Sequence, residues 1–219
     1  MARALRGARA GTASILPAGW SAFIKRRLAE STGFVLLGVA ALAAAALLGY
    51  APGDPSLNGA TDQAPANWLG RPGALVADLG LQVMGLVAGL GPLLLAAWGV
   101  QVARKRPPAW PWVRIMLALV AGLALSVAAS ALPVPDAWPL ASRLGGAAGT
   151  VLLGHLTNLT ESLLPGWPAE ANGALAALLG LAALLGASGL TRRDARALWR
   201  GLSRGAVRAW ALAHGAARR

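Results

Sequence analysis

The sequence predicts an all-α, polytopic membrane protein: a four-transmembrane-helix bundle with a short interfacial helix and a basic juxtamembrane C-terminal helix. Hydrophobic residues make up 56% of the 219 residues, whereas about 45–50% is usual in soluble domains. Charged residues make up only 13%, against about 25% in soluble domains. The charges cluster between four long apolar runs, and a bilayer core needs roughly 20 residues of helix. This pattern excludes a soluble globular enzyme, a disordered chain and a coiled coil.

The N-terminal arm, residues 1–32, is the first predicted segment. It carries six basic residues. Its first part, Met1–Trp20, lacks the apolar core of roughly 7–15 residues that precedes the cleavage site of a signal peptide. We therefore expect a basic cytoplasmic arm that stays on the protein.

The transmembrane domain is predicted over residues 33–190. Its second apolar run contains Gly91 and Pro92, and a proline inside a helix removes one backbone hydrogen bond. We expect a kink or locally loosened hydrogen bonding there. The small residues and the proline indicate an oligomer interface, a hinge or ordinary close packing between spans. The four spans are predicted at about residues 33–50, 79–102, 115–132 and 173–190.

The distribution of basic residues predicts the orientation. Eighteen of the 20 lysines and arginines fall in the arm, in the loop after the second run and in the tail after the fourth. Only Arg71 and Arg143 fall on the opposite side. Because cytoplasmic loops carry the excess of lysine and arginine, we expect both termini in the cytoplasm.

Turn-forming residues concentrate in the first outer loop. Tyr50 and Pro52 are followed by Asp54-Pro55-Ser56, where the prolines stiffen the chain and Asp54 can cap neighbouring amides. A second turn-rich stretch, Asn67–Ala74, includes Pro72 and Gly73 and leads into the second span.

The second outer loop contains Gly145-Gly146 and Gly149 ahead of an apolar stretch, Thr150–Leu159. This stretch is too short to cross a bilayer and predicts an interfacial or re-entrant helix. We interpret His155, which lies within it, as a polar face residue rather than a metal ligand or proton carrier.

Residues that carry transport or catalysis are scarce. The chain has no cysteine and only two histidines, far apart, which excludes disulfides, iron–sulfur clusters and a histidine-based metal cluster. The spans contain no charged pair and no histidine relay. We interpret Asp78 as a helix-entry residue at the outer start of the second span, with a proton relay as the alternative. No catalytic, cofactor-binding or metal-binding residue is predicted.

The C-terminal tail, residues 191–219, is predicted to form a cytoplasmic basic amphipathic helix. Such a helix beside a membrane span lies along anionic headgroups, and each basic residue contributes about 1 kcal/mol near the surface. Nucleic-acid binding is the alternative, because phosphate attracts the same charges. The lipid-surface residues are Arg192, Arg196, Arg200, Arg204 and Arg208.

Taken together, these motifs resemble the N-terminal four-helix membrane domain of the FtsK/SpoIIIE-type bacterial DNA translocases. The likeness covers residues 25–190 approximately. The residues that carry it are Tyr50, Pro52, Asp54, Pro55, Ser56, Pro72, Gly73, Asp78, Gly145, Gly146 and Gly149.

The resemblance implies a multi-pass inner-membrane domain that anchors the protein at the division septum and contacts divisome membrane proteins. It also implies a homo-oligomer. In that family a linker leads on to a hexameric motor that translocates DNA with ATP and Mg, and to a winged-helix domain that reads DNA.

The chain departs from this pattern at its end. It stops at Arg219, after the juxtamembrane tail, without a linker, motor or winged-helix domain. A phosphate-binding loop needs a glycine-rich turn followed by Lys and Ser/Thr, and neither Lys25 nor Lys105 stands in one. We therefore expect no enzyme activity and no cofactor in this chain, with ATP and DNA binding left to a full-length parent. The alternative is an independent small multispan protein, either a transporter or a subunit of a membrane complex.

Overall fold

The computed structural model describes residues 20–55, 64–105, 110–140 and 142–189, and the predicted tail arginines lie outside these ranges. Within them the chain forms α-helices and one 3-10 helix, with no strand. The predicted all-α fold class is therefore confirmed. The elements are α1 (Trp20–Leu48), α2 (Gly70–Met84), η1 (Gly85–Gly89), α3 (Leu90–Ala103), α4 (Pro111–Ser130), α5 (Gly146–Leu163) and α6 (Ala169–Ser188).

Four helical segments are long and apolar enough to cross a membrane. They lie in α1, in the stretch from α2 to α3, in α4 and in α6, in the order that the sequence predicts. Their bounds are Glu30–Leu48, Gly70–Ala103, Pro111–Ser130 and Glu170–Ser188.

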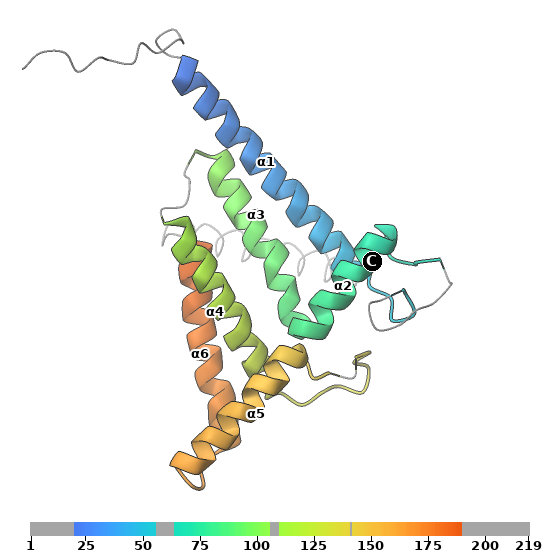
Figure 1. The fold of residues 1–219 in the computed structure, drawn as a ribbon, viewed down its shortest axis with the longest axis vertical. Coiled ribbons are helices and arrows are strands. Elements are labelled where there is room, and N and C mark those ends of the chain that lie inside the picture. Colours follow the sequence, from blue (N-terminus) through green and yellow to red (C-terminus); the bar gives the residue numbers. More distant parts are fainter. Residues whose placement is uncertain (1–19, 56–63, 106–109, 141, 190–219) are drawn as a thin grey trace, which may run out of the picture.

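The spans form two antiparallel pairs, α1 with α3 and α4 with α6 (Figure 1). Glycines allow the helices of each pair to approach closely. A Cβ atom placed on Gly33 of α1 would lie 2.5 Å from the backbone nitrogen of Ala103, and one on Gly180 of α6 would lie 2.6 Å from Leu125 of α4. Small residues drive such packing because lipid provides no hydrophobic force between helices.

The predicted second span is interrupted by η1, and the chain reverses direction there (Figure 1). A Cβ atom on Gly80 would lie 3.5 Å from the side chain of Ala88, which is too close for one straight helix. Gly85 makes the break with φ 61°, a conformation that glycine adopts without steric cost. The expected kink at Pro92 is wrong, because Pro92 lies in the first turn of α3, where its missing N–H costs nothing.

The helix predicted over Thr150–Leu159 is also longer in the structure, where α5 runs from Gly146 to Leu163. Of the glycines that were expected to precede the helix, Gly145 does so as its N-cap, whereas Gly146 and Gly149 lie in its first turn. Thr150 and Thr157 donate hydrogen bonds to carbonyls one turn earlier, at 2.8 and 2.9 Å, so their polar side chains are satisfied within the helix.

The spans define two ends of the molecule. The proximal end contains the start of α1, the end of α3, the start of α4 and the end of α6. The distal end contains α2 and α5, and Figure 1 shows these two helices one after the other in a diagonal row across the ends of the spans.

Candidate functional site: two turns at the distal end

Asp54 closes the first distal turn. Its carboxylate oxygens accept hydrogen bonds from the backbone N–H groups of Ala66 and Asn67, at 2.7 and 3.0 Å. Hydrogen bonds to an ionised carboxylate are about twice as strong as neutral ones. The loop that leaves α1 is thus tied to the residues that lead into α2.

Asn67 continues this connection from the other side. It is buried, and its amide nitrogen donates to the Ala46 carbonyl in the last turn of α1, at 2.8 Å. Its side-chain oxygen accepts from the Leu69 N–H at 3.1 Å. The last carbonyls of a helix lack partners within the helix. Asn67 therefore satisfies a carbonyl at the end of α1 while it orients the residues that lead into α2. Sequence reasoning did not single out Asn67, although its turn-rich surroundings were a signal.

Tyr50 follows the end of α1, near enough to Asp78 and Asp54 for both charges to act on its phenol. Burial raises the pKa of Tyr50, and the negative charges of Asp78 and then Asp54 raise it further. Asp78 is 7% exposed and accepts a hydrogen bond from Gln82 one turn later, at 2.7 Å. It lies in the third turn of α2, so its interpretation as a helix-entry residue is wrong.

The second distal turn is a close contact among α2, α4 and α5. A Cβ atom on Gly145 or Gly149 would overlap the Ser126 carbonyl of α4, and one on Gly146 would lie 2.5 Å from the Val83 carbonyl of α2. The Leu86 N–H donates to the Leu144 carbonyl at 2.9 Å, which joins the end of α2 to the start of α5. Only glycine permits this backbone-to-backbone approach.

A further polar contact lies at the proximal end, and sequence reasoning missed it. Trp98 and Gln101 of α3 donate hydrogen bonds to the carbonyls of Ala187 and Ser188 in the last turn of α6, at 2.8 and 2.7 Å. Arg114 of α4 donates to the Gln101 side-chain oxygen at 2.8 Å. Three spans therefore meet around the end of α6.

Gly189 follows this helix end in the left-handed conformation, with φ 61°. A Cβ atom there would overlap the Arg114 guanidinium. The left-handed conformation favours glycine at this position, and the Arg114 side chain would have to move to admit a larger residue.

The predicted site residues fall into two groups that the structure does not bring together. The first group surrounds the end of α1 and the start of α2, where Pro55, Gly73 and Asp78 are buried, Tyr50 and Asp54 are half-buried, and Pro52 and Pro72 are exposed. The second group contains Gly145, Gly146 and Gly149, all buried. Ser56, Arg192, Arg196, Arg200, Arg204 and Arg208 lie outside the described residues.

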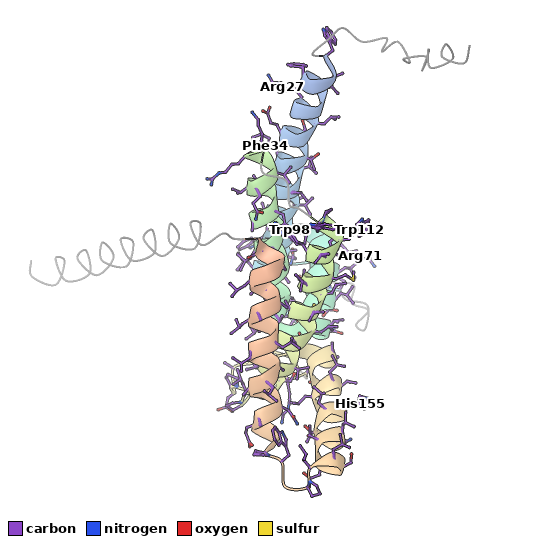
Figure 2. All side chains as sticks on the ribbon, turned by 90° about the vertical axis from the view of Figure 1, so that its left-hand side faces the viewer. Arg27, Phe34, Arg71, Trp98, Trp112 and His155 are labelled. Atoms are coloured by element: carbon purple, nitrogen blue, oxygen red, sulfur yellow. The ribbon has the colours of Figure 1, made fainter. Side chains whose placement is uncertain are left out.

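His155 lies on the side of α5 that faces away from α6 (Figure 2) and is exposed. In the part of the chain that the structure describes, no three His, Asp or Glu side chains come together to hold a metal ion. The two turns fix the positions of the helices, and their hydrogen bonds connect helix ends and loops. They form a structural scaffold.

Comparison with known proteins identifies this scaffold. A family model described as the 4TM region of DNA translocase FtsK/SpoIIIE matches residues 25–164, a range that contains both distal turns. The chain belongs to the FtsK/SpoIIIE family. The predicted resemblance is confirmed, and with it a multi-pass membrane domain of the FtsK type.

Several curated relatives, each named DNA translocase FtsK, are similar to this FtsK-type chain. The protein of Rhizobium meliloti (strain 1021) is 37% identical over 131 residues, which are 60% of this chain and 15% of the relative. The protein of Brucella suis biovar 1 (strain 1330) is 34% identical over 188 residues, 80% of this chain and 20% of the relative. That of Azospirillum brasilense is 34% identical over 190 residues, 85% of this chain and 30% of the relative.

The chain thus spans less than a third of the length of these FtsK relatives. The match lies in the membrane region, and no motor domain falls within it. No solved structure is significantly similar to the chain.

Proposed function

We propose that this chain is the membrane-anchoring and septum-assembly domain of an FtsK-like DNA translocase that acts in cell division and chromosome segregation. The observation that carries the proposal is the match of residues 25–164 to the FtsK/SpoIIIE membrane region. The two distal turns support it, because the residues that predicted the family lie in both of them.

In this proposal the distal end faces away from the cytoplasm and both termini are cytoplasmic. The clustering of 18 of the 20 basic residues outside the two distal loops supports this orientation. The location is the bacterial inner membrane at the division septum.

The proposed partners follow from the same role. The basic tail binds anionic headgroups, the domain contacts divisome membrane proteins, and copies of the chain form a homo-oligomer. DNA, ATP and Mg are bound by the motor domain of a full-length parent, while this segment needs no cofactor and performs no enzymatic step.

Depletion of the protein from its native cells tests this role. We expect filaments with unsegregated chromosomes, and we expect a fluorescent fusion of the full-length protein to gather at the septum. A solute-specific growth defect without filaments would contradict the proposal and favour an independent transporter or complex subunit.

Variants of the full-length protein connect this phenotype to the domain. Gly149→Val, which overlaps the Ser126 carbonyl, is expected to reduce septal fluorescence. Gly154→Val is the matched control, because nothing lies within 4 Å of a Cβ atom at that position. Equal septal fluorescence of both variants at equal protein level would mean that the distal turn has no part in assembly.

A further inference from the structure

α2 and α5 begin in the same way. Gly70 and Gly146 open them with φ 66° and 70°. Each opening N–H donates to the carbonyl three residues earlier, at 2.8 Å in both helices. A tightly packed glycine follows three residues later in each case, Gly73 and Gly149. The chain therefore contains two similar units, each made of a span, a helix that starts with Gly-x-x-Gly, and a returning span.

The surface of α5 is divided into three sectors. One sector contains Gly146, Gly149 and Thr157 and packs against the bundle. A second sector is mainly polar and contains the exposed residues His155, Asn158, Glu161 and Ser162, with one exposed apolar residue, Val151. The third is a stripe of exposed leucines at spacings of four, three and four residues: Leu152 (36% exposed), Leu156 (39%), Leu159 (54%) and Leu163 (69%).

α2 has the same three sectors in the same rotational order. Its packed sector contains Gly73, Ala74 and Ala77. Its polar sector contains the exposed Arg71, the half-buried Gln82 and the buried Asp78. Its exposed apolar stripe contains Val76 (54% exposed), Leu79 (52%) and Val83 (41%). Counted from the opening glycine of each helix, Val76 and Val83 correspond to Leu152 and Leu159, and Gln82 corresponds to Asn158.

Three sectors match the surroundings of a helix that lies in the membrane interface beside a bundle. In a helix surrounded by acyl chains, a polar sector would be energetically costly. A helix in water does not leave a leucine stripe exposed. In the interface, one sector faces the bundle, one faces water and one faces the acyl chains.

The position of the two helices agrees with this placement. They follow one another across the distal ends of the spans (Figure 1), and the Leu86–Leu144 backbone hydrogen bond joins η1, which follows α2, to the residues just before α5. The stripes add to the apolar surface that the spans already expose, for example at Leu119 of α4 and Leu178 of α6. The occupant that this continuity favours is lipid.

We propose that α2 and α5 form one interfacial ridge, whose apolar stripes rest on the acyl chains of the distal leaflet while Arg71 of α2 and the polar sector of α5 face water. In this arrangement α2 is no part of a span, and the second crossing consists of η1 and α3. The ridge binds the bilayer independently of any septal role.

Spin labels on single cysteines test the ridge, because the chain has no cysteine of its own. The protein is placed in bilayers of phosphatidylethanolamine and phosphatidylglycerol. Labels are introduced at Leu159→Cys and its neighbour Asn158→Cys on α5, and at Val76→Cys and Arg71→Cys on α2. Their collisions with oxygen, which concentrates in hydrocarbon, are compared with collisions with a water-soluble nickel chelate.

We expect the oxygen-to-nickel ratio to be severalfold higher at positions 159 and 76 than at 158 and 71. Leu178→Cys on α6 provides the reference for full lipid exposure. Equal nickel access within each pair would place both helices in water and overturn the proposal. Low access of both reagents at 159 and 76 would mean that protein, such as a second copy, covers the stripes, and would overturn it as well. The pairs on two helices give independent results if one variant does not fold.

Discussion

At the scale of single residues, Tyr50 reports on the first distal turn, because it is the only tyrosine of the chain. Its pKa is raised, first by burial and then by Asp78 and Asp54. Both effects disfavour the phenolate, so the folded state holds the proton more tightly than the unfolded chain does.

This shift predicts a loss of stability at high pH. The contribution of Tyr50 should be complete below the unfolded pKa of about 10 and should disappear as the pH rises through the higher folded value. The absorbance of the phenolate measures the pKa directly. Tyr50→Phe should remove this part of the pH dependence, and a Tyr50 titration identical to that of a free tyrosine would contradict the shift.

Asp54 shows how far residue-level prediction reached. Its residue type and turn context predicted an acceptor of backbone N–H groups, and it accepts two of them. Its partners, Ala66 and Asn67, lie across a loop, and no local rule relates residues so far apart. Asn67 escaped prediction for the same reason, since its bond to Ala46 depends on how α2 returns to α1.

At the scale of elements, the first turn of α5 depends on Gly149. In Gly149→Val the side chain would overlap the Ser126 carbonyl, and such overpacking costs about 1–3 kcal/mol. Reversible unfolding in mixed micelles measures this loss. Gly154→Val, on the open side of the same helix, should change the free energy of unfolding by less than the Gly149 variant does. Equal effects would show that helix propensity, and not the contact with α4, sets the cost.

Hydropathy predicted the four apolar segments because burial in lipid imposes a length and composition on each. It could not predict the reversal at η1, because the apolar residues of α2 and α3 continue through Gly85 without a polar or charged residue between Gln82 and Gln101. The start of α5 was misjudged because glycines normally weaken a helix. Here close contact with Ser126 and Val83 outweighs that preference.

At the scale of the whole molecule, the two helix pairs are held together at both ends. Distally, backbone contacts join the start of α5 to both α2 and α4. At the proximal end, the side chain of Gln101 in α3 bonds to both helices of the other pair. It donates to the Ser188 carbonyl of α6 and accepts from Arg114 of α4. These connections between distant segments arise from the tertiary arrangement, so single-sequence patterns do not reveal them.

Gln101→Ala should loosen the proximal connection between the pairs. Loss of two side-chain hydrogen bonds, one of them to a charged group, costs about 1–3 kcal/mol. The free energy of unfolding measures the loss, and Asn158→Ala, an exposed amide on α5, is the control. An effect no larger than that of the control would mean that the helix pairs pack independently of Gln101.

The anchoring of the end of α6 has a mechanical consequence. Beyond Gly189 the chain continues into its basic tail, and any tension on that tail enters the bundle at this point. Because Trp98 and Gln101 hold the final carbonyls of α6, a pull would be shared with α3 and, through Arg114, with α4. The membrane segment would then resist extraction from the bilayer as three connected spans, α3, α4 and α6, rather than as α6 alone.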